Sequence, residues 1–156
     1  MEIPVTKIQE MVIKPAPVFA FLKTLPLISL SLALLYIAWL IFPAFILLSL
    51  ITMLFACYRF RYIRKTLYTV EPQLIRIQRG IFFKRTDIVE MYRVKDYIIT
   101  QPFILQLFQL MNLTLKTTDA ENPVIWLRGI PRSDLTDVIR NHVQGARKAN
   151  RIFEIS

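Results

Sequence analysis

The pattern of apolar and polar positions divides the chain into two unlike parts. From Thr24 to Tyr58 the chain runs for 35 residues without one charged side chain. A charge near the centre of a bilayer is costly, so a stretch of this kind is typical of a membrane segment. Beyond residue 65 the apolar positions instead alternate with polar ones, which is typical of half-buried β-strands.

The apolar stretch is too long for one straight span. As a single helix it would rise about 52 Å, against a hydrocarbon core about 30 Å thick. Pro43 lies near its middle and lacks the N–H that an uninterrupted helix needs. The pattern therefore favours a helical hairpin over residues 19–62, with helices at about 19–38 and 44–62. The alternative is a single tilted or kinked span.

Charges flanking the predicted hairpin indicate its orientation. Four cations and no acid lie within residues 59–65, just after the second helix, and the turn around Pro43 carries no charge. The arm over residues 1–18, with Lys23 just after it, is also weakly basic. The positive-inside rule places such flanks in the cytoplasm, so we expect both termini to be cytoplasmic.

Short apolar runs separated by turn residues follow the hairpin. Ile75 and Ile77 fall on one face of a predicted strand, and Arg76 and Gln78 fall on the other. Gly80 supplies a turn, because glycine tolerates positive φ. Strands are predicted at 66–70, 73–79, 82–91, 94–100, 113–118 and 124–128. Their spacing predicts a curved antiparallel sheet, a sandwich or a partly closed barrel.

Two segments of this region follow a helical period. Residues 102–110 carry large apolar side chains at helical spacing, so we expect a short helix that either plugs the sheet or touches lipid. Residues 132–148 place Leu135, Ile139 and Val143 on one stripe, which predicts an amphipathic C-terminal helix. Residues 149–156 are left as a tail.

Several motifs in the second half have a recognisable pattern: YTV (68–70), LIRIQRGIF (74–82), TDIV (86–89), QPFILQLF (101–108), LTLKT (113–117) and LRGIP (127–131). Together they resemble one protein family, the bacterial PH-like domain known as the membrane-flanked domain. Two transmembrane helices typically precede the domain in that family, so the resemblance covers about residues 25–145. One departure is Asn112, in a turn where the family usually has glycine. Asparagine also tolerates a left-handed backbone, so we expect the turn to persist.

The resemblance implies a fold class and a location. The protein is expected to be a membrane protein with a two-helix transmembrane hairpin, followed by an α+β PH-like domain over residues 66–148. In that domain a curved antiparallel sheet or partly closed barrel is accompanied by a C-terminal helix. The expected location is the bacterial inner membrane, crossed more than once, with the domain on the cytoplasmic side.

Catalytic chemistry is sparse in this sequence. His142 is the only histidine and falls on the apolar stripe of the last helix, while Cys57, the only cysteine, lies in the second apolar helix. Together they form neither a nucleophile–base arrangement nor a set of metal ligands. The acid pairs 87/90, 119/121 and 134/137 are interpreted as solvated or helix-capping groups. We therefore expect no enzyme, no metal and no cofactor.

The net charge of +9 is concentrated after the hairpin, where residues 59–156 hold 17 Lys and Arg against nine Asp and Glu. Anionic lipid headgroups are the expected partners of a basic domain beside a membrane. Nucleic acid is not expected, since no nucleic-acid-binding motif is present. Two basic clusters are the candidate headgroup contacts, although the second also fits the solvated face of a strand. They are Arg59, Arg61, Arg64 and Lys65, and then Arg76, Arg79, Lys84 and Arg85.

Two functions remain open at this point. The first hypothesis is a membrane-anchored, non-catalytic scaffolding module at the cytoplasmic face, which docks a protein partner or assembles with its own copies into a homo-oligomer. The alternative is a module that senses or handles anionic lipid. The basic clusters and the apolar segment 102–110 favour the second hypothesis, and the well-patterned β domain without catalytic residues fits both.

Overall fold

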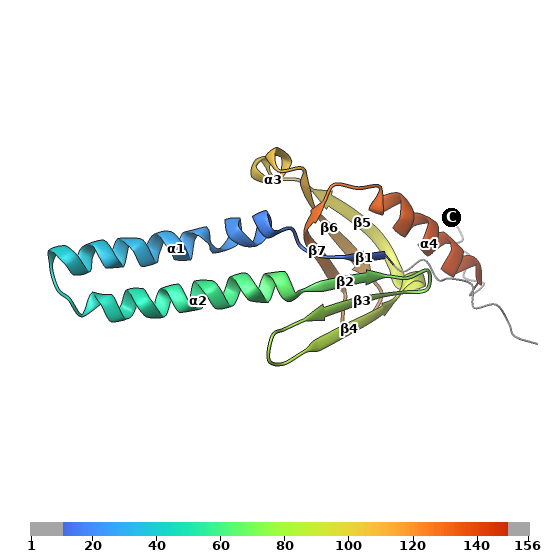
Figure 1. The fold of residues 1–156 in the computed structure, drawn as a ribbon. Coiled ribbons are helices and arrows are strands. Elements are labelled where there is room, and N and C mark those ends of the chain that lie inside the picture. The colour runs from blue at the N-terminus through green and yellow to red at the C-terminus, as the bar shows by residue number, and fades with distance from the viewer. Residues whose placement is uncertain (1–10, 150–156) are drawn as a thin grey trace, which may run out of the picture.

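Two long helices lead into a β domain that carries a C-terminal helix (Figure 1). The fold is that of a computed structural model, in which residues 11–149 are described. The predicted arm before residue 11 and the tail from residue 150 lie outside the described residues. The described part is PH-like α+β, as predicted.

The helical hairpin consists of α1 (Pro17–Leu40) and α2 (Phe45–Lys65), and Pro43 lies in the connection between them. Compared with the predicted 19–38 and 44–62, α1 is two residues longer at each end, and α2 begins one residue later and ends three residues later. Proline suits the first turn of α1, because the N–H it lacks has no partner there. Both helices are long and apolar enough to cross a membrane, by length and composition.

Small residues line the contact between the two helices. Ser31 Oγ donates to the Ser49 carbonyl at 3.0 Å, and Ser49 Oγ donates to the Ser31 carbonyl at 2.8 Å. Buried alanines, including Ala38 and Ala56, let the helices approach closely. Small residues with reciprocal hydroxyl bonds are typical of helix contacts in lipid. The large apolar side chains point outward, with Trp39 88% exposed.

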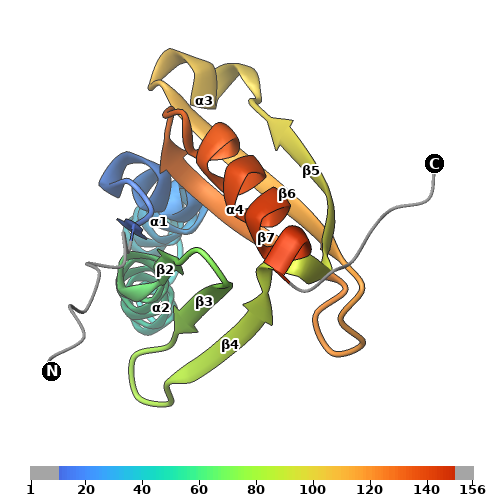
Figure 2. The ribbon, with the colours of Figure 1, turned by 90° about the vertical axis from the view of Figure 1, so that its right-hand side faces the viewer.

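Within residues 11–149, seven strands form two antiparallel sheets, which Figure 2 shows from the end opposite the helices. The first sheet has the order β1 (Met11–Ile13), β2 (Leu67–Val70), β3 (Leu74–Arg79) and β4 (Arg85–Glu90). The second has the order β5 (Val94–Thr100), β6 (Leu110–Thr117) and β7 (Val124–Pro131). A 3-10 turn, η1 (Met91–Arg93), joins the two sheets. The helices α3 (Phe103–Leu107) and α4 (Leu135–Ala149) complete the fold.

The core fills the space between the sheets and α4. Ile75 and Ile77 from β3 are fully buried there, as their alternation predicted. Leu135 and Ile139 from α4 join the same cluster, so the predicted apolar stripe faces the sheets. These side chains account for the strand and helix periods seen in the sequence.

Strand β1 was not predicted. Its three residues pair antiparallel with β2, with Met11 opposite Val70 and Ile13 opposite Tyr68. Part of the segment interpreted as an arm is therefore a strand of the first sheet. The chain leaves this strand, enters α1 and returns through α2 directly into β2, so both ends of the helical hairpin are tied to neighbouring strands.

Gly129 in β7 joins the β domain to the base of the helical hairpin. Its carbonyl accepts a hydrogen bond from the Ala16 N–H at 2.8 Å. Its φ is +63°, and a Cβ at this position would lie 2.0 Å from Cγ of Phe19. Phe19 itself packs against Leu105 of α3 and Leu110 of β6. Only glycine fits here, because both the backbone conformation and the aromatic ring exclude a side chain.

The expectation for Asn112 was wrong in its detail. The left-handed residue at the start of β6 is Gln109, with φ 53°, whereas Asn112 lies inside the strand. Asn112 Oδ1 instead accepts a hydrogen bond from the Gly129 N–H at 2.9 Å. This asparagine therefore supports the joint at Gly129 rather than a turn.

Candidate functional site

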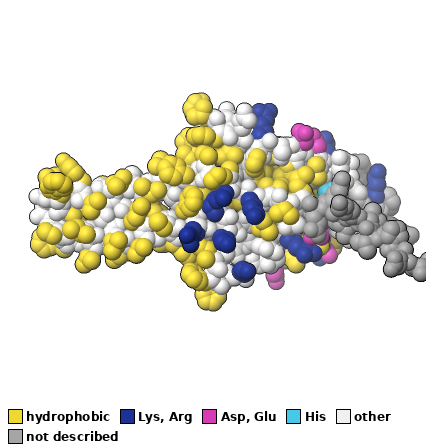
Figure 3. Space-filling model, viewed as in Figure 1, with side chains coloured by type: hydrophobic (Ala, Val, Ile, Leu, Met, Phe, Trp, Pro, Cys, Tyr) yellow, Lys and Arg dark blue, Asp and Glu magenta, His cyan; other side chains and the backbone are white. Residues whose placement is uncertain are grey.

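Four cations surround a pocket of about 370 Å³ at the joint between the helical hairpin and the β domain. Lys23 comes from α1, Arg59 from α2, Arg79 from the end of β3 and Arg128 from β7. We call this the junction pocket. Figure 3 shows Lys and Arg side chains gathered at this level, beside the apolar surface of the helices.

Aromatic side chains form much of the wall of the junction pocket. The Arg128 guanidinium lies 5.3 Å from the centre of the Trp126 ring, and Lys23 Nζ lies 5.9 Å from that of Phe19. Such contacts orient a cation without neutralising it. Tyr62 and Tyr68 also line the pocket.

Tyr68 stays a neutral phenol in this wall. Burial raises the pKa of Tyr68 above its usual value of 10.0, and the hydrogen bond from Arg128 and the charges of Arg79 and Arg128 only partly offset this. Its hydroxyl oxygen accepts the Arg128 backbone N–H at 3.2 Å. The positive charge of the pocket is therefore not compensated by a phenolate.

Among the residues that the structure describes, no carboxylate compensates the charge either. Within residues 11–149, none of the ion pairs involves Lys23, Arg59, Arg79 or Arg128. Like charges gathered beside low-dielectric walls concentrate a positive field. Guanidinium groups present forked donors that match the oxygens of phosphate. The arrangement suits a phosphate-bearing ligand.

A second basic pocket, of about 250 Å³, lies next to the first. Arg79 lines both pockets and is the cation that they share. We call the second one the turn pocket, since it includes Gly80 of the β3–β4 turn. Its cations are Lys14, Arg64, Lys65, Arg79 and Lys84.

The structure places the predicted site residues in different surroundings. Arg59 and Arg79 line the junction pocket, and Arg64, Lys65, Arg79 and Lys84 line the turn pocket. The other three predicted cations, Arg61, Arg76 and Arg85, lie elsewhere.

Each of these three has its own setting. Arg61 lies on another side of the hairpin beside Cys57, and Arg85 pairs with Asp87 at 2.7 Å. Arg76 projects from the opposite face of β3 to Arg79 and lies 3.1 Å from Glu71. The second cluster is therefore split, because a strand sends positions 76 and 79 to opposite faces.

Sequence reasoning did not predict Lys14, Lys23 and Arg128 as site residues. All three are distant along the chain from the two predicted basic clusters. Each stands alone among apolar neighbours, so no local run of charge marks it. One signal was available in β7. Trp126 and Arg128 are two residues apart in a predicted strand, so an aromatic and a cation share one face.

The fold agrees with a comparison to known families. A family model of the bacterial PH domain matches residues 18–147 of the chain. This chain belongs to the bacterial PH domain family. The match begins at the start of α1, so both apolar helices belong to the matched unit, and the predicted resemblance is confirmed. No curated protein and no solved structure matches the chain.

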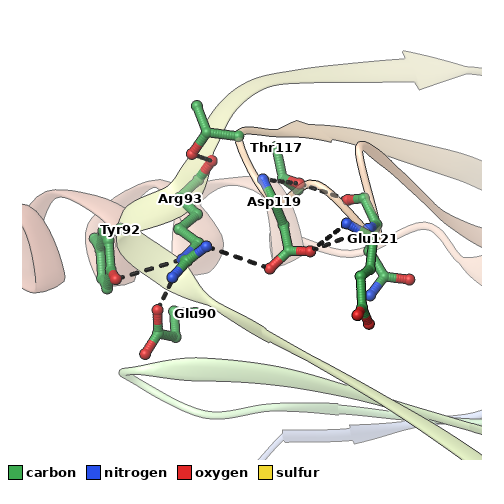
Figure 4. A network of polar contacts seen from close by, with 8 residues as sticks. Glu90, Tyr92, Arg93, Thr117, Asp119 and Glu121 are labelled. Atoms are coloured by element: carbon green, nitrogen blue, oxygen red, sulfur yellow. Dashed lines mark hydrogen bonds and ion pairs between the residues drawn. The ribbon is translucent and has the colours of Figure 1, made fainter.

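A second polar cluster of this bacterial PH domain lies where η1 meets the β6–β7 turn (Figure 4). Arg93 Nε donates to Glu90 at 2.8 Å, and Arg93 Nη1 lies 3.5 Å from Asp119 Oδ2. Asp119 Oδ1 accepts the backbone N–H groups of Glu121 and Asn122 at 3.0 and 3.1 Å. Hydrogen bonds from Tyr92 and Arg93 hold the pKa of Glu90 below its usual 4.5. We call this cluster the Arg93 network.

The Arg93 network is structural in character. Its carboxylates are engaged with a cation or with backbone donors, so they do not form a free acid–base pair. Among the described residues there is no group of three or more His, Cys, Asp and Glu side chains able to hold a metal ion. His142 is half-buried on α4, and its Nδ1 has no hydrogen-bond partner within residues 11–149. The junction pocket thus remains the candidate site of this bacterial PH domain.

Proposed function

We propose that this bacterial PH domain protein is a non-catalytic binding module, anchored in the inner membrane by its helical hairpin with both termini in the cytoplasm. We further propose that its junction pocket binds the phosphate of an anionic lipid headgroup. The observation that carries this proposal is a set of four cations at the base of two apolar helices, none of which is in an ion pair of the described residues.

The dimensions of the hairpin support this placement. With 24 and 21 residues, α1 and α2 are about 36 and 32 Å long, close to the thickness of a hydrocarbon core, about 30 Å. Trp39, next to the connection, then reaches the far interface, where tryptophan is favoured. The opposite ends reach the cytoplasmic interface, where Lys23 and Arg59 extend their charged groups toward phosphates. The junction pocket is then level with the headgroups.

Electrostatics supplies the affinity in this proposal. Each basic residue close to an anionic leaflet contributes about 1 kcal/mol of attraction. The junction pocket adds geometry to that general attraction, because its cations come from four different elements and converge on one space. A single headgroup bound in this pocket can therefore contact several cations at once, which a flat basic surface would not allow.

The junction pocket contains its own reporter, Trp126. A Trp39→Phe background leaves Trp126 as the single tryptophan of the full-length protein in detergent. We expect short-chain phosphatidylglycerol to change Trp126 emission saturably, and phosphatidylcholine of equal chain length to leave it unchanged. In the Arg59→Gln/Arg79→Gln double variant, two lost attractions weaken binding by about 30-fold.

The matched control removes the same charge elsewhere. Arg140 and Lys148 are exposed on α4 and do not line either basic pocket. The Arg140→Gln/Lys148→Gln variant should bind phosphatidylglycerol like the parent. Equal responses to the two lipids, or equal weakening in both double variants, would contradict a specific headgroup site.

The first sequence hypothesis, protein docking, is kept as a second candidate because of strand β5. This strand lies at the edge of its sheet, and Ile98 and Ile99 are 44% and 48% exposed although they face opposite sides. An open edge with exposed apolar residues on both faces favours addition of an extended segment from a partner or a second copy.

Cross-linking tests this second candidate. In a Cys57→Ser background, a cysteine introduced at Ile98 should give a disulfide-linked dimer or an adduct of stoichiometric mass in native membranes. An Arg140→Cys variant should not. Recovery of only the monomer from Ile98→Cys would remove the support for docking at β5.

A further inference from the structure

The turn between β3 and β4 presents two phenylalanines to the outside. Phe82 is 82% exposed and Phe83 is 94% exposed. The turn closes only because Gly80 has φ +112°, with the Phe83 carbonyl oxygen 1.8 Å from where its Cβ would be. Residues 81–83 therefore form a tight apolar tip, followed directly by Lys84 and Arg85.

The short helix α3 forms a second apolar tip. Leu105 is buried against Phe19, which fixes the helix to the base of the helical hairpin. Its neighbours face outward, with Phe103 80% exposed and Leu107 71% exposed. The sequence left open whether this segment plugs the sheet or touches lipid. Leu105 packs inward, and Phe103, Ile104 and Leu107 are exposed.

Both tips lie at the level of the two basic pockets, where the helical hairpin meets the β domain. Phe83 shares a pocket wall with Tyr62 near the end of α2, and Lys84 lines the turn pocket with Arg64. On the other side, Leu105 packs with Phe19 in a cluster that also contacts Leu22 of α1. In Figure 1 the β3–β4 turn and α3 extend toward the helices on opposite sides of the hairpin. Figure 3 shows apolar projections on both sides of the gathered Lys and Arg.

We propose that the two tips, Phe82 and Phe83 on one side and Phe103, Ile104 and Leu107 on the other, insert into the cytoplasmic leaflet beside the helical hairpin. This inference rests on the proposed membrane crossing. Exposed clusters of large apolar residues indicate an interaction surface. The lipid bilayer is the occupant favoured here, because the apolar surface is continuous with that of the helices and cations border it at headgroup level.

The helical hairpin and the two tips then give the β domain three contacts with the membrane, which hold its orientation. One helical hairpin alone would let the domain tilt about its axis, whereas two flanking tips oppose tilting in both directions. The junction pocket consequently keeps a constant height relative to the lipid phosphates. The insertion depends on apolar burial, so it should persist in membranes without anionic lipid.

Depth measurement by spin labelling tests the insertion directly. The full-length protein in a Cys57→Ser background is reconstituted into phosphatidylcholine vesicles, and single cysteines are introduced at Phe82 or Phe103. The ratio of collisions with oxygen to collisions with a nickel chelate gives the depth of each label. We expect both tip labels to lie about 5–10 Å below the phosphates.

Two control positions separate this inference from the membrane crossing. A label at Ile51, exposed on α2, should report the bilayer interior, and a label at Arg140 on α4 should report water. If the tip labels match Arg140 while Ile51 is deep, the insertion is overturned and the crossing stands. If Ile51 is in water, the crossing fails and the insertion with it. Tip labels shielded from both reagents would mean that protein covers them, which also overturns the inference.

Discussion

The junction pocket and the Arg93 network are both clusters of charged residues, yet they are built on opposite principles. In the Arg93 network a guanidinium meets two carboxylates, and one of these carboxylates also accepts backbone N–H groups. In the junction pocket four cations face one space, and no ion pair of residues 11–149 includes any of them. The charges of the first cluster are paired within the protein, whereas the cations of the second pair with no carboxylate of the described residues.

Under the proposed function, this difference separates charge that supports the fold from charge that binds a ligand. In a paired network the donors and acceptors are already occupied, so little capacity is left for a ligand. Gathered like charges repel each other in the free protein, so an anion that binds there relieves the repulsion. Substitutions in the Arg93 network should therefore change the free energy of unfolding, and substitutions of the cations in the junction pocket should change lipid binding.

The joint beside the junction pocket gives the largest expected effect. Gly129→Ala forces a side chain into a left-handed backbone and into the Phe19 ring, so we expect the free energy of unfolding to fall by about 2–5 kcal/mol. Trp126 fluorescence during chemical unfolding measures the change. Gly145→Ala is the matched control, because a Cβ there meets nothing within 4 Å in α4. That control should be neutral or slightly stabilising.

The Arg93 network should affect stability alone. Asp119→Ala removes the acceptor of two turn N–H groups and one partner of Arg93, so unfolding should become easier by about 1–2 kcal/mol. Phosphatidylglycerol binding by the folded protein should not change. A variant that loses lipid binding at unchanged stability would contradict the structural role of this network.

Arg79→Gln should weaken lipid binding and leave stability nearly unchanged, the opposite of the result expected for Asp119→Ala. Loss of one attraction of about 1 kcal/mol weakens phosphatidylglycerol binding by about fivefold. The free energy of unfolding should stay within about 0.5 kcal/mol of the parent, because Arg79 forms no ion pair among the described residues. Arg76→Gln, from the opposite face of the same strand, should leave binding unchanged.

The smallest expected effect is a difference in pH dependence. The pKa of Glu90 is lowered in the folded protein, so its stabilisation is present above pH 4.5 and is lost as pH falls through the folded pKa. The pKa of Tyr68 is raised, so its contribution is present below pH 10.0 and is lost as pH rises through the folded pKa. Glu90→Gln should make the free energy of unfolding depend less on pH in the acid range. Tyr68→Phe should do the same in the alkaline range.

Periodicity and chain length were sufficient to predict much of the fold. The alternation of Ile75 and Ile77, the stripe of Leu135 and Ile139, and the break at Pro43 each reflect a local physical requirement. The start of β6 was placed three residues late, because the chain reverses through Gln109, a residue type that does not mark a left-handed position. Family motifs then connected these elements to a PH-like architecture.

The candidate site was less accessible to sequence reasoning. Arg59 and Arg79 were found because they belong to local runs of charge, but Lys23 and Arg128 come from elements brought together only by long-range packing. Strand β1 was missed for the same reason, since three residues carry too little periodic signal and depend on their pairing with β2. Arg76 illustrates the opposite error. It was grouped with Arg79 because the two are close in sequence, but they lie on opposite faces of β3.

Native mass spectrometry of the full-length protein, extracted gently from bacterial membranes, tests the proposed headgroup site most directly. We predict that the parent protein and the Arg140→Gln/Lys148→Gln variant each retain one anionic phospholipid, and that the Arg59→Gln/Arg79→Gln variant loses it. The same lipid content in all three proteins would contradict the proposal.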